Sequence, residues 1–167
     1  YDNNKNTIFN FIDNNQFSNL LDFKEYDLKD LCECNYLEKI IKYCKDLRIY
    51  EYLMENSINP SFTTTERKFY NLIFMAVGFN NKQLFDTALK YNISYKYIFS
   101  DGSNIMHYAS RFSDFYILNE ILEKNLITDF EAITIHGHTY QGFLSANDKL
   151  SRKNRIKLIK TIFAKNN

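Results

Sequence analysis

Tryptophan is absent from this chain of 167 residues, and the residues that punctuate sheets are scarce, with four glycines and one proline. An all-β fold needs many turns rich in glycine and proline between its short strands, so this scarcity argues against one. No apolar run approaches the roughly 18 residues of a membrane-spanning helix, and the first six residues lack the layout of a signal peptide. We therefore expect a helical, soluble chain.

Cysteine and net charge are also low. Cys32, Cys34 and Cys44 are an odd number, which argues against a disulfide framework and is typical of reduced thiols. We therefore expect a cytoplasmic location, either in the producing cell or, for a delivered factor, in a host cell. The formal net charge is only +1, so the molecule as a whole has no general attraction to nucleic acid or membrane, and neither is an expected partner.

Motifs that carry chemistry are missing as well, since the chain has no P-loop, no GxGxxG and no HExxH. His136 and His138 form an H-x-H pair, which more often marks a solvated turn than a metal site. The C-x-C of Cys32 and Cys34 lacks a second pair of ligands of the usual kind. We therefore expect no enzyme, no cofactor and no metal, with an enzyme on a helical scaffold as an alternative.

The most ordered pattern in the chain is a helix, a tight turn and a second helix between Asp101 and Asn125. The first helix is expected over 104–112, and Ser113 or Asp114 is expected to cap the second. Apolar residues recur there at helical spacing: Ile105, Met106 and Ala109, then Ile117, Ile121 and Leu122. Two short helices bury little surface alone, so this pair requires neighbours stacked on it.

Such neighbours are indicated by a repeat of 33 to 35 residues. Residues suited to cap a second helix recur at this spacing: Asp13, Asp46, Asn81 and Asp114. Five residues before each lies an apolar one: Ile8, Ile41, Ala76 and Ala109. The spacing predicts one all-α domain over 1–167, with repeats at about 1–23, 36–58, 67–93, 100–126 and 135–166 and hairpin-like loops between them. Because the chain starts at Tyr1 and not at methionine, it is also a candidate fragment of a larger protein.

These residues resemble the ankyrin repeat. Gly102, His107, Ala109 and Leu122 match that family's glycine, histidine, first alanine and second leucine, and Gly137 and Thr139 match its glycine and threonine in the last copy. The departures are Asn104 for threonine, Ile105 for proline, and Ser113 and Asn125 for two glycines. The resemblance implies an ankyrin-like solenoid of four to five stacked helix-turn-helix repeats, in which His107 makes a structural hydrogen bond.

The resemblance also implies a function, that of a non-catalytic scaffold for protein-protein interaction. Partners of the family usually contact the tips of the loops and the exposed side of the first helix. Carried over position by position, the partner-binding surface is Ser100, Asp101, Ser103, Arg111 and Phe112 in the central copy and Arg67, Lys68, Tyr70, Gly78 and Phe79 in the copy before it. For Phe79 and Phe112, packing inside the array competes with binding and is the more frequent role of an aromatic residue at a helix end, although exposed aromatics and arginine are typical of binding hot spots.

The C-terminal stretch is strongly basic, with seven Lys or Arg and no acidic residue from Lys149 onward. One interpretation is a capping helix whose polar face closes the array. The alternative is a binding helix for an anionic surface, either nucleic acid or acidic lipid. The capping interpretation, which the pattern favours, predicts two sets of residues. Packed inward are Leu158, Ile159, Ile162 and Phe163; left in water are Lys153, Lys157 and Lys160.

Overall fold

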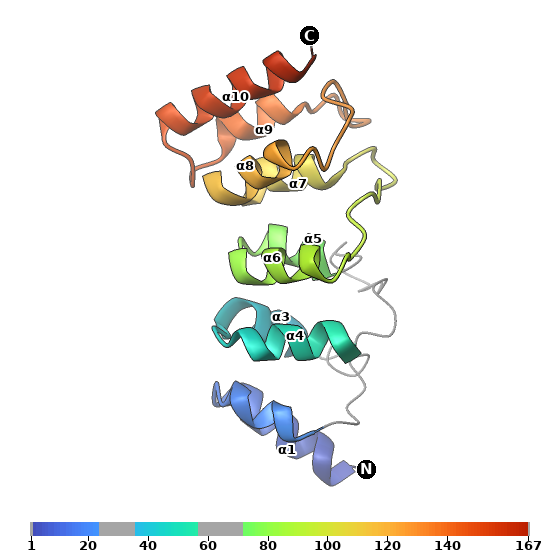
Figure 1. Ribbon diagram of the computed structural model, residues 1–167, viewed down its shortest axis with the longest axis vertical. Coiled ribbons are helices and arrows are strands. Elements are labelled where there is room, and N and C mark those ends of the chain that lie inside the picture. Colours follow the sequence, from blue (N-terminus) through green and yellow to red (C-terminus); the bar gives the residue numbers. More distant parts are fainter. Residues whose placement is uncertain (1, 24–35, 57–71, 167) are drawn as a thin grey trace. The chain divides into compact units, whose positions relative to one another are not determined.

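The computed structural model describes residues 2–23, 36–56 and 72–166, and all regular elements within these ranges are helices (Figure 1). In chain order they are α1 (Asp2–Asp13), the 3-10 helix η1 (Phe17–Asp22), α3 (Tyr36–Tyr43), α4 (Leu47–Asn56), α5 (Leu72–Gly78), α6 (Lys82–Lys90), α7 (Ile105–Phe112), α8 (Phe115–Glu123), α9 (Tyr140–Ala146) and α10 (Arg152–Asn166). The predicted all-α class is confirmed for these ranges. None of the described helices is long and apolar enough to cross a membrane.

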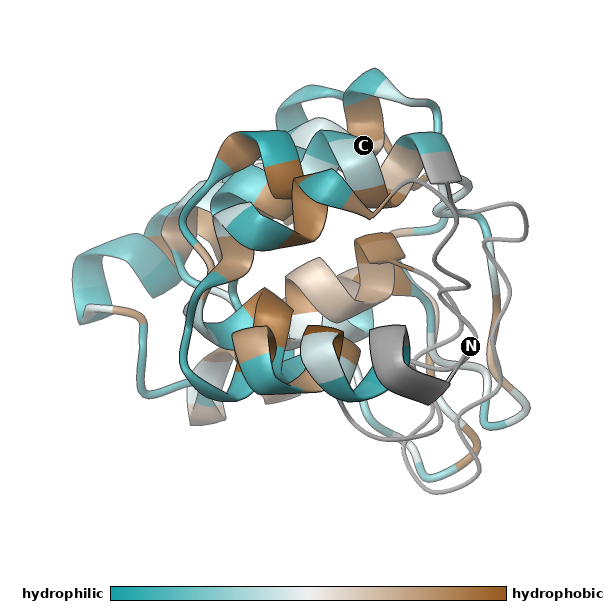
Figure 2. Cartoon of the chain, turned by 90° about the horizontal axis from the view of Figure 1, so that it is seen from below, coloured by the Kyte–Doolittle hydropathy of each residue, from teal (hydrophilic) through white to brown (hydrophobic). Residues whose placement is uncertain are grey.

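The helices form because their apolar residues recur at helical spacing and meet on one face. In α3 the buried residues are Leu37, Ile40 and Ile41, which follow an i, i+3, i+4 pattern. Hydrophobic and hydrophilic stretches accordingly alternate along single helices in Figure 2. The four apolar positions predicted from the repeat are at most 2% exposed: Ile8, Ile41, Ala76 and Ala109. The recurring apolar positions of the repeat therefore lie in the core.

Capping residues set where the second helices begin. Asp114 is the N-cap of α8 and its carboxylate accepts the Tyr116 N–H at 3.0 Å, as predicted. Asp46 directly precedes α4 and accepts the Arg48 N–H at 3.0 Å. The prediction for Asp13 is wrong, because Asp13 is the last residue of α1 and η1 begins four residues later.

Asparagine follows four of the described helices in the left-handed conformation that usually requires glycine; one of these asparagines is Asn80 after α5, with φ of 53°, and the other three share a further feature. Asn15, Asn92 and Asn125 have φ of 56°, 55° and 50°. The next residue in each case donates its N–H to a carbonyl five residues back, at 2.8 to 3.0 Å, which is the Schellman arrangement. Asparagine tolerates this conformation better than other non-glycine residues, so the helices end at defined positions although the chain has only four glycines.

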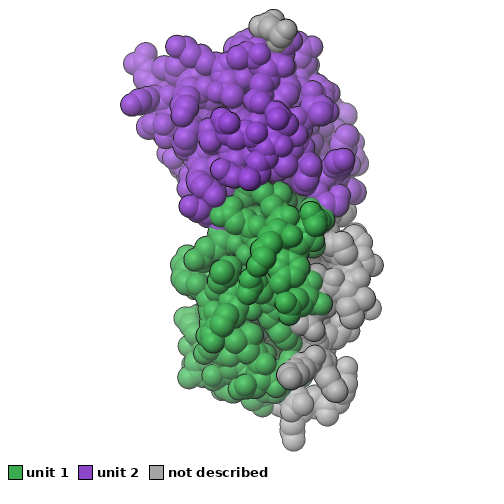
Figure 3. All heavy atoms as spheres, in the orientation of Figure 1, with its two compact units in different colours: residues 1–76, 83–93 green, residues 77–82, 94–167 purple. Residues whose placement is uncertain are grey.

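The chain divides into two compact units, coloured green and purple in Figure 3. Unit 1 comprises residues 1–76 and 83–93, and unit 2 comprises residues 77–82 and 94–167. Within unit 1, α1 packs on η1 and α3, and η1 packs on α4. Within unit 2, α7 packs on α8 and α9, and α10 packs on α8 and α9. The helices thus follow one another in pairs, each with a first and a second helix. First helices contact first helices (α1 with α3, α7 with α9), and second helices contact second helices (η1 with α4, α8 with α10).

Candidate functional site

Two tight turns of unit 2, at residues 99–103 and 134–138, have the same hydrogen bonds 35 residues apart. In each turn the N–H of the first residue donates to the carbonyl of the fifth, at 2.8 and 3.0 Å. The N–H of the fourth residue donates to the carbonyl of the first, at 2.9 Å in both. This fourth residue is Gly102 or Gly137, with φ of 79° and 77°, a conformation that disfavours residues with a Cβ.

The two turns also lie against one another. The Ile135 N–H donates to the Asp101 carbonyl at 2.8 Å. A Cβ added to Gly102 would lie 3.4 Å from the Ile133 carbonyl oxygen, tighter than most such contacts. The turns and the helices that follow them, α7 and α9, thus form a rigid edge of unit 2.

A buried polar cluster anchors this edge at the start of α7. Asn104 caps the helix by accepting the N–H groups of Met106 and His107 at 2.9 and 3.2 Å, and its own N–H donates to His107 Nδ1 at 3.2 Å. The Asn104 side-chain amide donates to the Tyr140 hydroxyl at 2.7 Å, and that hydroxyl donates to the Asp129 carbonyl at 2.7 Å. The cluster therefore ties α7, α9 and the segment between α8 and α9 together.

Burial controls the protonation of this cluster. It lowers the pKa of His107 below 6.5, because desolvation disfavours the imidazolium, and the backbone carbonyls of Ala132 and His138 only partly offset this effect. It also raises the pKa of Tyr140 to about 12. Both rings are at most 1% exposed, so no dissolved ligand reaches them. The chemistry of the cluster is therefore that of a structural hydrogen-bond network, in which neutral His107 accepts through Nδ1.

Aromatic side chains form a continuous line over the same edge. We call this line the aromatic stripe; it consists of Tyr97, Phe99, Tyr108, Phe112, Phe143 and His138, with Arg111. From Tyr97 to Phe112, successive rings have centroids 5.1, 4.8 and 6.0 Å apart. The Arg111 guanidinium lies 5.1 Å from the Phe112 ring and 5.9 Å from the Phe143 ring, and His138 lies 5.1 Å from Phe143.

The stripe is accessible along much of its length. Tyr97, Arg111 and His138 are exposed, and Tyr108, Phe112 and Phe143 are half-buried. Three exposed isoleucines lie in or directly before the two turns: Ile98 at 65%, Ile133 at 59% and Ile135 at 73%. Half-buried aromatic rings next to an exposed arginine are the side-chain types that dominate binding hot spots.

The structure places the predicted partner-binding residues unevenly. Arg67, Lys68 and Tyr70 lie outside the described residues. Ser100 and Arg111 are exposed, and Gly78, Phe79, Asp101 and Phe112 are half-buried. Ser103 is only 6% exposed, which corrects its expected position on the surface. Its N–H is held by the Asp101 carboxylate at 2.9 Å, so this residue closes the turn and faces inward.

Sequence reasoning missed the residues that extend the surface to the turn at 134–138 and to α9. Phe143 follows Tyr108 by 35 residues and Ile133 follows Ile98 by 35. The spacing between Gly102 and Gly137 is also 35, so carrying the central copy forward by this offset finds both positions.

The basic C-terminal helix agrees only partly with its prediction. Leu158 and Ile162 are buried and Lys153, Lys157 and Lys160 are exposed, as predicted. Ile159 is half-buried, and Phe163 is 56% exposed, so the prediction that Phe163 packs inward is wrong. Phe163 lies about 100° further round the helix than Ile162, which turns it out of the buried stripe.

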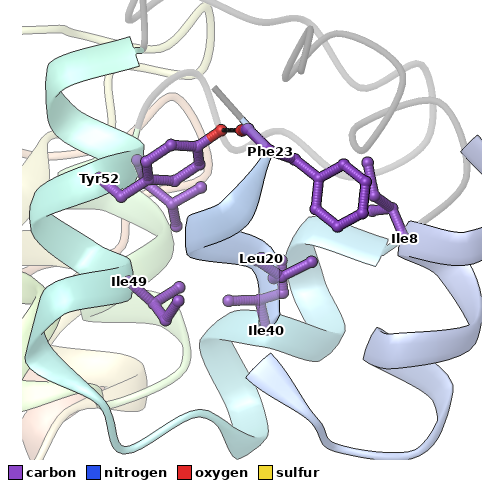
Figure 4. Close-up of a pocket in the computed structure, with 7 residues that line it drawn as sticks. Ile8, Leu20, Phe23, Ile40, Ile49 and Tyr52 are labelled. Atoms are coloured by element: carbon purple, nitrogen blue, oxygen red, sulfur yellow. Dashed lines mark hydrogen bonds between the residues drawn. The ribbon is translucent and has the colours of Figure 1, made fainter. Parts of the chain in front are cut away.

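Unit 1 contains a small apolar pocket (Figure 4). Its lining residues are Ile8, Leu20, Phe23, Ile40, Ile49, Tyr52 and Leu53. The Tyr52 hydroxyl donates to the Phe23 carbonyl and is therefore already used. The cavity volume is about 10 Å³, near the lower limit for a single water molecule, so the pocket is a packing gap.

Among the described residues, no group of three or more His, Cys, Asp or Glu side chains is placed to hold a metal ion. Cys44 is a buried free thiol whose pKa is raised by burial, and Cys32 and Cys34 lie outside the described residues. The comparisons with other proteins add no assignment: neither a protein-family model, nor a curated protein, nor a solved structure matches the chain.

Proposed function

We propose that this chain is a non-catalytic module for protein-protein interaction, built as an ankyrin-like array of stacked helix pairs. The turns at 99–103 and 134–138 support the repeat, because their hydrogen bonds coincide at an offset of 35 residues. Asn104 and Thr139, also 35 residues apart, cap α7 and α9 with side-chain oxygens. Contacts of first helix with first helix and second with second in both units are typical of stacked repeats.

The aromatic stripe is the observation that carries the proposed binding role. Apart from Tyr97, its side chains belong to two short helices and two hydrogen-bonded turns, and Phe99 is buried at 4% exposure, so little side-chain or backbone order has to be gained on binding. Phe112, Arg111 and Phe143 form its centre, where an arginine lies between two half-buried rings. A partner protein would gain most by covering this centre and excluding water from its rim.

The test compares two variants of equal size in an affinity purification from the native cell. One carries Arg111→Ala, Phe112→Ala and Phe143→Ala; the control carries Tyr43→Ala, Leu47→Ala and Arg48→Ala, on an exposed surface of unit 1. Proteins that bind the stripe should be retained by the parent and the control and lost from the stripe variant. Binding equal to that of the parent in a folded stripe variant would exclude the stripe as the interface.

A further inference from the structure

The outer face of α10 combines two kinds of side chain that a simple capping helix does not need together. The helix has six basic and no acidic residues. At about 100° per residue, Arg152, Lys153, Ile156, Lys160 and Phe163 fall within an arc of about 100°. Ile156 is 44% and Phe163 is 56% exposed, and the three cations beside them are exposed as well. Leu158 and Ile162, which are buried, lie on the opposite side.

Within unit 2, the other cations of α10 are engaged by the fold. Arg155 donates to the Asn147 carbonyl at 2.7 Å, Lys165 donates to Asn125 Oδ1 at 2.6 Å, and the Lys157 ammonium lies 4.9 Å from the Phe115 ring centre. Arg152, Lys153 and Lys160 have no carboxylate partner in the part of the chain that the structure describes. Their charge is therefore available to an external anion.

We propose that this face of α10, defined by Arg152, Lys153, Ile156, Lys160 and Phe163, binds the surface of a membrane that contains anionic lipids. The inference is independent of the proposed role of the aromatic stripe. A lipid interface offers negative headgroups to the cations and an acyl boundary to the two apolar side chains. A nucleic acid backbone would bind the cations but offers no apolar surface to the exposed parts of Ile156 and Phe163. The overall charge of +1 does not prevent this, since screening limits each charge to about 8 Å at physiological salt.

Fluorescence tests the geometry directly, because the chain has no tryptophan of its own. Phe163→Trp places a single indole on the proposed face, and Tyr43→Trp is the matched control, since Tyr43 is 58% exposed in unit 1 and Phe163 is 56% exposed. With vesicles of phosphatidylcholine and phosphatidylserine at 7:3, the emission of the Phe163→Trp protein should shift to the blue, and that of the Tyr43→Trp protein should not. Vesicles of phosphatidylcholine alone should shift neither.

Co-sedimentation with the same vesicles separates charge from apolar insertion. Each basic residue near an anionic surface contributes about fivefold in partitioning, so Arg152→Gln, Lys153→Gln and Lys160→Gln together should lower it on the order of 100-fold. Lys45→Gln, Lys96→Gln and Lys124→Gln remove the same charge elsewhere and should change it by no more than about threefold at physiological salt. Ile156→Ser with Phe163→Ser should weaken vesicle binding but leave retention on heparin unchanged.

Several results would overturn the proposal. These are equal shifts for the two tryptophan variants, equal binding to neutral and anionic vesicles, and vesicle binding that survives either the charge or the serine substitutions. Binding to duplex DNA without binding to vesicles would also overturn it, in favour of a phosphate-backbone site. All substituted side chains are exposed, and circular dichroism of each variant verifies that the fold is retained.

Discussion

Units 1 and 2 stack their helix pairs in the same order but join them by different polar chemistry. In unit 2, the Ser113 hydroxyl donates to the Val77 carbonyl at 3.0 Å, and the Asn147 amide donates to the carbonyls of Ser110 and Ser113 at 3.0 and 2.7 Å. These bonds are buried and directed at backbone groups near the ends of first helices. The described pairs of unit 1 are joined, apart from the bond between Tyr52 and Phe23, mainly by exposed side chains that contact carboxylates.

This difference shows that a hydrogen bond contributes most to the position of a helix pair when its acceptor is buried. A buried backbone carbonyl cannot turn to water when its partner is removed, so each bond in unit 2 fixes the register of one helix pair on the next. An exposed carboxylate is rehydrated at once, so each ion pair in unit 1 is replaceable. Unit 2, whose helix pairs are joined by these buried hydrogen bonds, also carries the aromatic stripe.

Asn147→Ala should have the largest effect on stability. Asn147 is 2% exposed, and its amide is the donor to two buried carbonyls. Leaving both without a donor should lower the free energy of unfolding by about 3 kcal/mol, measured by urea denaturation followed by circular dichroism. Ser145→Ala, on an exposed residue of α9, the helix that Asn147 follows as its C-cap, is the control and should change the free energy of unfolding by less than about 0.5 kcal/mol. Equal losses of unfolding free energy in the two variants would contradict the importance of the two buried hydrogen bonds of Asn147.

Enlarging a small residue where helices pack should have the next largest effect, and should do so in both units. Ala76 in unit 1 and Ala109 in unit 2 are fully buried. Leucine at either site should overpack the core and cost about 2 kcal/mol. Ala164→Leu, on the exposed face of α10, should be nearly neutral. A melting temperature that is unchanged by Ala109→Leu would count decisively against the predicted repeat register.

These alanines also show how far the sequence could predict the fold. Apolar positions recur in the printed sequence at the offset of the repeat, so the helix class, the buried positions and the Asp114 cap could be predicted from it. The buried hydrogen bonds between helix pairs could not be predicted, because nothing in the spacing marks Asn147 as a donor to carbonyls of α7 and the turn after it. The outward direction of Phe163 was missed because a stripe of apolar residues defines the buried face only to within about one residue, which is about 100° around the helix. The stripe was predicted in part, through Arg111 and Phe112.

Acid should lower the free energy of unfolding through His107, by less than the two preceding substitutions do. The pKa of His107 is lowered in the folded protein, so the unfolded chain binds the proton more tightly. The contribution of neutral His107 is therefore complete above pH 6.5 and is lost as the pH falls from 6.5 toward the lower folded pKa. His107→Gln keeps an acceptor for the Asn104 N–H but does not titrate. Urea denaturation at pH 7.5 and 5.5 should show a smaller loss for His107→Gln than for the parent; equal losses would assign the acid sensitivity to other groups.

Asn125→Gly should stabilise the chain slightly. The φ of 50° at Asn125 costs asparagine little and glycine nothing, and the bond from Lys165 that glycine removes is exposed and contributes little, so the gain should be a few tenths of a kcal/mol. Asn125→Ala should cost about 1 kcal/mol, because alanine is strained in this conformation. The same substitutions at Asn92, which closes α6 in unit 1, should give the same signs in thermal unfolding. Opposite signs at the two sites would show that they are not equivalent ends of a repeat.

The smallest effect is expected at the surface of unit 1. Lys39 Nζ lies 3.0 Å from Asp13 Oδ1, but the two side chains are 33% and 52% exposed. Water and salt screen this pair, so Lys39→Gln should lower the free energy of unfolding by no more than about 0.5 kcal/mol, and by less in 0.5 M NaCl. The loss on Asn147→Ala should be the same at both salt concentrations, since no ion pair is involved. If Lys39→Gln instead proved as costly as Asn147→Ala, the exposed joint would be as rigid as the buried one, and the contrast between the two units would fail.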